Sequence, residues 1–276
     1  MLEAQHQLVV GSPDLVGTTF PSLFVSHGAP NLVFEDAPAH HFLKQLGTQV
    51  GRPSAILVIS AHWATACPTV SAASQPETIH DFSAFTPELY QLRYPAAGAP
   101  DLAERVVNLL VTSGIEAELD PSRGLDHGAW NPLLLMYPDA EIPVTQLSLQ
   151  PRLGPAHHLA IGQALAPLRH EGVLMLASGS LTHNLWELEA NRSNAQAPVW
   201  ASEFVDWITA AATDHKLEQL LNYRQLAPHA ERNHPTEEHL LPLFVAIGAG
   251  NLGVKTRLLH SSFTYGSLSM AAYAFA

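Results

Sequence analysis

The sequence is poor in cysteine, in long apolar runs and in basic residues, and each shortage excludes a class of protein. Cys67 is the single cysteine among 276 residues, so no disulfide can form within the chain. This agrees with a reducing compartment. The longest apolar runs have the length of a strand, whereas a membrane-spanning helix needs about 20 apolar residues. Residues 1–20 show neither the basic leader nor the apolar stretch of a signal peptide. We therefore expect a cytoplasmic protein with no membrane partner.

Basic residues are too few for a nucleic-acid partner. The chain has 13 Lys and Arg against 25 Asp and Glu, a formal net charge of −12, whereas binding to a phosphate backbone needs a basic surface. Three catalytic motifs are missing as well: the Walker A loop of nucleotide enzymes, the G-x-S-x-G elbow of serine nucleophiles and the H-E-x-x-H pair of zincins. These absences leave histidine as the main chemical signal.

Histidine is the residue in surplus. The chain has 16 histidines, more than its 13 Lys and Arg together. Histidine at this frequency, beside one cysteine, indicates a metal site or a proton-transfer site. Most of the histidines are expected to be scattered surface residues, among them the pairs His40–His41 and His157–His158 in predicted helices.

Apolar runs and amphipathic stretches alternate along the chain, which predicts an α/β fold. Residues 22–26, 55–60 and 172–177 are apolar at nearly every position. This is typical of strands covered on both faces, in a mainly parallel or mixed sheet flanked by helices. Further strands are expected at 69–73, 115–119, 142–149 and within 263–275, and helices at 37–47, 101–114 (capped by Asp101), 131–138, 155–170, 198–212, 214–221 and 236–248. We expect one catalytic domain over residues 1–276, with residues 1–20 as a peripheral extension.

Each of the three apolar strands leads into a histidine. The phrases "LFVSHG", "ILVISAHW" and "VLMLASGSLTHN" carry His27, His62 and His183. Because ligands of parallel sheets bind outside the carboxyl ends of the strands, these histidines are expected to share one metal site at that edge. For His27 and His62, a role in a turn or a loop hydrogen bond stays open. His183 suits either a metal ligand or a general base.

A fourth candidate lies in "ERNHPTEEHLLPL", residues 231–243. His234 precedes a proline and is expected outside the helix. Thr236 is expected to cap the helix, which would place His239 in its first turn. His239 is the expected metal ligand and Glu238 the next choice, although an acidic residue in a first helical turn also suits the helix dipole.

A second group of histidines lies in loops rich in aromatic residues. His127 in "GLDHGAWNPL" has the setting of a proton shuttle, with an ordinary turn as the alternative. His80 in "TIHDFSAF" is a weaker candidate. Asp81 beside it is expected to cap a turn, while Phe82 and Phe85 could line a pocket for an aromatic ring.

Seven phrases, taken in order, resemble a single family. They are "SHGAP", "SAHW", "IHDF", "LDHGAW", "SGSLTHNL", "HPTEEHLLPL" and "GSLSM", and they run from about residue 21 to residue 272. With them the chain resembles the 4,5-DOPA extradiol dioxygenase family, within the class III (LigB-like) ring-cleavage dioxygenases. The fold of that family, a central sheet flanked by helices, agrees with the strands and helices expected here.

The resemblance implies an extradiol dioxygenase that opens the ring of a catechol such as L-DOPA with O₂ to give a semialdehyde. It implies metal ligands at His27, His62 and His239. It implies that His183 is the catalytic base or, as in zinc-bound relatives, a further metal ligand. His127 would be a second catalytic histidine near the substrate.

The resemblance indicates the identity of the metal less directly than it indicates the ligands. Many class III enzymes hold Fe(II) with two histidines and one carboxylate, whereas His239 stands where a carboxylate is expected. The activity requires Fe(II), but an all-histidine set also suits Zn(II), which could occupy the site in isolated protein. Two alternatives therefore stay open: a zinc-dependent hydrolase, and a non-catalytic metal-binding protein on the same scaffold. Association into a homo-oligomer is neither required nor excluded.

Overall fold

The computed structural model describes residues 19–189, 197–250 and 256–276. Within these ranges, eight strands form one mixed sheet in the order β4-β3-β5-β2-β6-β1-β10-β7. The central strands β5, β2, β6 and β1 run parallel, and antiparallel pairs extend the sheet on both sides. The strands are β1 (Ser22–Ser26), β2 (Ala55–Ala64), β3 (Thr69–Ser71), β4 (Glu118–Asp120), β5 (Val144–Leu149), β6 (Val173–Gly179), β7 (Arg257–His260) and β10 (Ala272–Phe275). A separate pair is formed by β8 (Phe263–Thr264) and β9 (Leu268–Ser269). The predicted α/β class with a mainly parallel, mixed sheet is confirmed.

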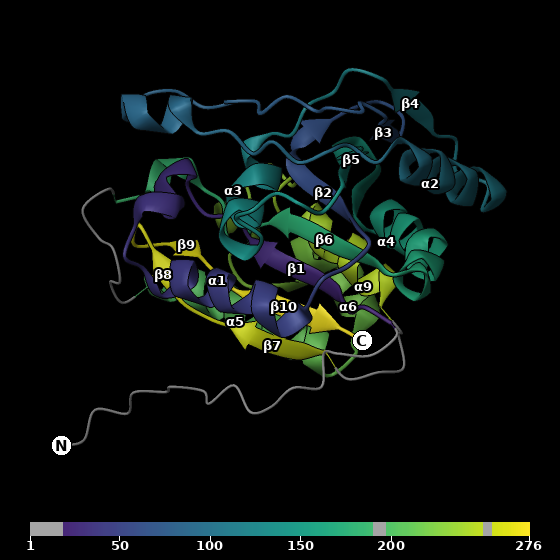
Figure 1. Cartoon of the computed structure of the whole chain (residues 1–276). Helices are drawn as coiled ribbons and strands as arrows, with labels where there is room; N and C mark the ends of the chain where they lie inside the picture. The colour runs from purple at the N-terminus through teal and green to yellow at the C-terminus, as the bar shows by residue number, and fades with distance from the viewer. Residues whose placement is uncertain (1–18, 190–196, 251–255) are drawn as a thin grey trace.

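Helices cover both faces of the sheet, as Figure 1 shows. Successive residues of β2 serve different cores: Ile56 and Val58 pack in one, Leu57 and Ile59 in the other. This explains why β1, β2 and β6 are apolar at most positions. The first core includes α1 (Pro38–Val50) and α3 (His127–Met136). The second includes α2 (Pro100–Thr112), α4 (Gly154–Leu165), α5 (Val199–Thr213) and α9 (Leu241–Ala249). Three short helices, α6 (Leu217–Leu221), α7 (Tyr223–Leu226) and α8 (Ala230–Asn233), join α5 to the segment before α9.

Several predicted boundaries are wrong. The helix expected at 236–248 starts only at Leu241, so Thr236 is not its cap and His239 precedes it. The helix expected at 131–138 starts earlier, at His127, because the side chain of Asp126 caps it by accepting from Ala129 N. In α2 the capping position belongs to Ala99, and Asp101 lies in the first turn.

Other differences concern strands and the terminus. The strand expected at 115–119 is β4, shifted to Glu118–Asp120, and β7 was not predicted. The strand expected at 55–60 continues to Ala64, which places His62 within β2. Most of the expected N-terminal extension, residues 1–18, lies outside the described residues.

One buried histidine contradicts the expectation of a surface residue. His158 on α4 has no exposed surface. Its Nε2 accepts from Gln150 N at 3.1 Å, and its Nδ1 donates to Gly154 O at 2.7 Å. Both ring nitrogens are satisfied locally, so His158 joins the start of α4 to the end of β5.

Gly248 also has a packing role, although "GAGNLG" at 248–253 has the spacing of a dinucleotide-binding loop. That motif requires glycines between a strand and a helix, whereas Gly248 lies inside α9. A Cβ added to Gly248 would stand 2.1 Å from Leu159 O. The glycine therefore permits close contact of α9 with α4. No helix within the described ranges combines the length and apolar character needed to cross a bilayer.

Candidate metal centre

Strand ends at one edge of the sheet bring the predicted histidines together. His27 directly follows β1, and β6 ends four residues before His183. His62 lies on the part of β2 beyond its last pair with β6, Ser60 with Ser178. His239 comes from the turn before α9. Residues distant in the sequence thus meet at the carboxyl edge of the parallel strands, as the sequence predicts.

Three imidazole nitrogens converge at the centre of this cluster. His62 Nε2 lies 3.1 Å from His27 Nε2 and 3.2 Å from His239 Nε2. The ring centroids of His27 and His239 are 5.3 Å apart. Side chains that point the same type of nitrogen at one another have the arrangement of ligands around one cation.

The surroundings of His27 determine which ring nitrogen carries its proton. Ser178 Oγ donates its only proton to Gly128 O at 2.5 Å. The same oxygen lies 3.0 Å from His27 Nδ1, so it accepts a hydrogen bond from that nitrogen. With the proton on Nδ1, His27 presents a lone pair on Nε2 toward His62.

Carboxylates face Nδ1 of the other two rings. Asp81 Oδ2 lies 3.4 Å from His62 Nδ1, and Glu238 Oε1 lies 3.3 Å from His239 Nδ1. A carboxylate accepts only, so both rings hold their proton on Nδ1 and turn a lone pair on Nε2 inward. Lone pairs from three neutral rings repel one another unless a cation lies between them. The donor set therefore fits a metal ion.

Glu238 is close to the metal centre but faces the outer side of His239. Its Oε1 also accepts from Thr236 Oγ1 at 2.9 Å. Among the described residues, two groups have the spacing of metal ligands, one of His27, His62 and His127 and one of His183, Glu238 and His239. The two groups meet through the contact between His62 and His239.

His183 stacks on His239, with ring centroids 3.3 Å apart and planes 7° from parallel. Two backbone contacts hold its loop: His183 N donates to Asn233 O at 2.9 Å, and His234 Nε2 donates to Leu181 O at 2.7 Å. His234, predicted outside a helix, indeed follows α8 and is fully buried. It thus helps to position the loop that carries His183.

His127 stands at the first position of α3, beside the cluster. Its ring centroid is 3.9 Å from that of His62 and 5.4 Å from that of His27. Asp81 Oδ1 accepts from His127 Nδ1 at 2.9 Å and from His127 N at 3.0 Å. His127 thus holds its proton on Nδ1 and keeps a lone pair on Nε2. Asp81, expected only to cap a turn, contacts two histidines of the site.

Burial lowers the pKa of the clustered histidines. It is the largest cause at all four positions, and the positive charge of neighbouring protonated rings adds to it. The pKa falls to about 3 for His62 and to about 4 for His183. The pKa values of His27 and His239 lie well below 6.5. All four rings are therefore neutral at pH 7, with lone pairs available for a metal or a proton.

Gly179 and Gly128 allow the segments that carry the histidines to pack closely together. A Cβ added to Gly179 would stand 2.1 Å from His239 O, and one added to Gly128 would stand 2.3 Å from Ser60 Oγ. Gly179 thus lets the turn before α9 lie on the end of β6, where Ser180 N donates to His239 O at 2.8 Å. Side chains at either position would push the histidine-bearing segments apart.

A cavity of about 300 Å³ opens beside the histidines. Its wall is mostly apolar and aromatic away from the cluster, and it includes both phenylalanines expected there from the sequence. The lining residues are His27, Gly28, Ala29, Pro30, His62, Asp81, Phe82, Phe85, His127, Ser180, His183, Leu185, Leu188 and Leu268. His80 lies outside it and places its Nε2 3.1 Å from Leu92 O.

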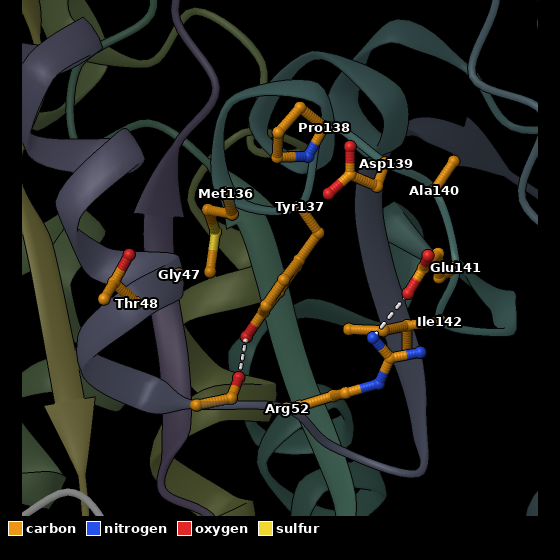
Figure 2. A pocket seen from close by; sticks show the side chains of 11 residues that line it. Gly47, Thr48, Arg52, Met136, Tyr137, Pro138, Asp139, Ala140, Glu141 and Ile142 are labelled. Atoms are coloured by element: carbon orange, nitrogen blue, oxygen red, sulfur yellow. Dashed lines mark hydrogen bonds and ion pairs between the residues drawn. The ribbon is translucent and has the colours of Figure 1, made fainter.

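A second cavity, of about 310 Å³, lies at the amino ends of β2 and β5. Figure 2 shows its two polar contacts: Arg52 paired with Glu141 at 2.6 Å, and Tyr137 OH donating to Gly51 O at 2.9 Å. No histidine lines it. Four of its lining residues are thus paired with one another.

Comparisons with known proteins agree on one family. Residues 21–276 match the family described as the catalytic LigB subunit of aromatic ring-opening dioxygenase. The chain belongs to the LigB family. It is 43% identical over 276 residues to the protein named 4,5-DOPA dioxygenase extradiol of Beta vulgaris, covering 96% of this chain and 99% of that one.

Bacterial proteins are similar to this LigB member as well. The protein named 4,5-DOPA dioxygenase extradiol of Escherichia coli K12 is 40% identical over 257 residues, with 92% of this chain and 93% of that one covered. A crystal structure of an uncharacterized protein from Escherichia coli K12 matches with a TM-score of 0.79 and 36% identity, covering 93% of this chain and 99% of the other. The chain is thus an extradiol ring-opening dioxygenase, an oxidoreductase with a histidine metal site.

Sequence reasoning named the histidines that the structure brings together but missed two of their hydrogen-bond partners. Asp81 and Ser178 lie within two of the phrases that resemble the family, "IHDF" and "SGSLTHNL". Their place within these phrases was the sequence signal that could have identified them. Their roles depend on which histidine each one faces, and this follows only from the packing of distant loops.

Proposed function

We propose that the protein is an Fe(II)-dependent extradiol dioxygenase that cleaves a catechol such as L-DOPA with O₂ to a semialdehyde. The observation that carries the proposal is the convergence of three imidazole Nε2 atoms beside an aromatic-walled cavity of about 300 Å³. The names of the relatives supply the candidate substrate. Both oxygen atoms enter the product, one in the aldehyde and one in the carboxylate.

His27, His62 and His239 are the proposed metal ligands. Their Nε2 lone pairs face one another, and their Nδ1 atoms are held by a hydroxyl and two carboxylates. When bound, Fe(II) supplies the electron transfer between ring and O₂ that side chains cannot provide, whereas Zn(II) has no redox chemistry. Zn(II) can nevertheless fill the same three-nitrogen set in isolated protein.

His183 is the proposed base. It lines the cavity, and because burial lowers its pKa to about 4 it is neutral at pH 7. It can therefore take the proton of a catechol hydroxyl, which makes the ring more electron-rich. Its stacking on His239 holds the ring in place.

His127 and the aromatic wall are proposed to orient the substrate. With its Nδ1 bonded to Asp81, His127 can meet the substrate only through Nε2. Phe82 and Phe85 stand edge to face, with centroids 5.3 Å apart. They offer the flat apolar contact that an aromatic ring prefers.

The LigB match favours ring opening over a zinc hydrolase or a metal-binding protein without activity. A cytoplasmic location and a single catalytic domain remain predictions from the sequence, which leaves the oligomeric state open.

The test is oxygen uptake by metal-stripped protein supplied with L-DOPA, after anaerobic addition of Fe(II) or Zn(II). We expect uptake with Fe(II) only, one O₂ for each L-DOPA consumed, and a yellow semialdehyde product. The matched control is the His62→Ala variant supplied with the same amount of Fe(II), which should take up no oxygen above free Fe(II). Absence of uptake with Fe(II) for L-DOPA and for simpler catechols would overturn the proposal.

A further inference from the structure

Asp81 lies between a proposed metal ligand and a proposed substrate-side histidine. We propose that this one carboxylate is a positioning residue for both, because it fixes the tautomers of His62 and His127 at once. The inference rests on the proposed function only for its catalytic part. Its metal-binding part holds for whatever substrate the site takes.

The two oxygens of Asp81 have different partners. Oδ1 accepts from His127 Nδ1 at 2.9 Å and from His127 N at 3.0 Å. Oδ2 lies 3.4 Å from His62 Nδ1. The side chain is 22% exposed and lines the cavity. It thus reaches the metal centre with one oxygen and the substrate side with the other.

Between His62 and His127, position 81 requires a side chain that only accepts hydrogen bonds. Asparagine has the same shape, but it offers one oxygen and one NH₂ group. Its oxygen would go to His127, where two donors wait, and its NH₂ would then face His62 Nδ1. His62 could accept from that NH₂ only by moving its own proton to Nε2. That shift removes the lone pair that a metal needs.

No neighbouring carboxylate can replace Asp81. Asp81 is the only carboxylate among the described residues that line the cavity. Asp126, which directly precedes His127 in the sequence, is fully buried. Its oxygens accept from Ser60, Arg123, Gln146 and Ala129 N.

The first experiment measures metal affinity directly. Metal-stripped wild type and Asp81→Asn are titrated with Zn(II) by calorimetry, without substrate. Loss of a group that orients a metal ligand weakens binding about 10- to 100-fold, and we expect a loss in that range. The control is Asp36→Asn, because Asp36 also bonds a histidine, His41 Nε2 at 2.6 Å, but on the surface. Unchanged affinity in a folded Asp81→Asn protein would overturn the proposal.

A second variant distinguishes the loss of histidine positioning from a general loss of structure. Asp81→Ala leaves space at a partly exposed site that a small carboxylate can enter. We expect formate to restore part of the Zn(II) affinity of Asp81→Ala and to leave wild type unchanged. Nitrogen-15 NMR of the histidine rings should show His62 protonated on Nδ1 in wild type and on Nε2 in Asp81→Asn. Formate without effect, together with unchanged tautomers, would contradict the proposal.

A double-mutant cycle then separates the two partners. In a His127→Ala background, Asp81→Ala should still weaken Zn(II) binding, because that effect acts through His62. Its additional effect on kcat for L-DOPA, measured at saturating Fe(II), should largely vanish, because that effect acts through His127. A kcat loss of undiminished size would show that Asp81 acts on the substrate itself. If L-DOPA proves not to be a substrate, the affinity and NMR measurements still decide the metal-binding part.

Discussion

Two cavities of nearly equal size lie at opposite ends of the central strands. The cavity at the carboxyl ends, about 300 Å³, is lined by histidines from two loops, one strand and the start of one helix. The cavity at the amino ends, about 310 Å³, has no histidine in its lining and contains two polar pairs, Arg52 with Glu141 and Tyr137 with Gly51. Volume therefore does not identify the site. Lone pairs that converge without a partner do.

The difference follows from how the chain connects the strands. At the amino ends the connections are short: residues 51–54 lead from α1 into β2, and residues 137–143 lead from α3 into β5. At the carboxyl end of β1 the connection is longer, since residues 27–37 lead to α1, and side chains from distant parts of the sequence meet over this edge. The following predictions test whether chemistry is confined to that edge.

The largest effect is expected from removing a proposed metal ligand. His62→Ala should abolish tight metal binding and lower kcat/KM about 1,000-fold or more, because metal and substrate would no longer be held in one geometry. At the other cavity, Arg52→Ala breaks an exposed ion pair and should leave kcat/KM within about twofold. Metal analysis and oxygen uptake check both variants. A large loss of kcat/KM in Arg52→Ala would show that the amino-end cavity also takes part in catalysis.

The next effect concerns the role of His183. His183→Gln should lower kcat about 100- to 10,000-fold, the usual range for loss of a general base, with metal content unchanged. Metal content and steady-state rates are measured on the same preparation. A matched control is His41→Gln, at a surface histidine away from both cavities. Loss of metal from His183→Gln would instead assign His183 as a ligand.

A smaller effect is expected from acid. His183 has a pKa near 6.5 when unfolded and about 4 in the folded protein. The unfolded chain thus binds more protons as the pH falls from 6.5 toward 4, and the metal-free protein loses stability in that window. His183 alone should contribute about 2 kcal/mol between pH 7 and pH 5. Urea unfolding should show a shallower pH dependence for His183→Gln. A Tyr137→Phe protein should keep the full wild-type dependence.

The smallest effect is expected at the amino-end cavity. Tyr137→Phe removes the hydrogen bond to Gly51 O and should lower the free energy of unfolding by about 1 kcal/mol. Its kcat/KM and metal affinity should match wild type. Urea unfolding and oxygen uptake together check this. A catalytic defect in a stable Tyr137→Phe protein would show that the two cavities are coupled.

The sequence by itself determined the fold class and the histidines. Strands buried on both faces are mostly apolar, so β1, β2 and β6 were visible as runs, and the histidines after or within them marked the edge of the candidate site. His239 was chosen as a ligand from the pattern of residues 231–243, although the expected helix cap at Thr236 was wrong. A local sequence pattern is enough to predict a strand where burial dictates apolar residues.

Only the tertiary structure decided which partner each histidine has. Asp81 faces His127 across 46 residues of sequence, and Ser178 faces His27 across 151. Such pairs depend on how loops pack at the sheet edge, and no periodicity in the chain records that packing. The same holds for His158, which looked like a surface residue until both its nitrogens proved to be bonded inside α4 and at the end of β5. Histidine number and position are sequence properties, whereas tautomer, burial and ligand geometry belong to the fold.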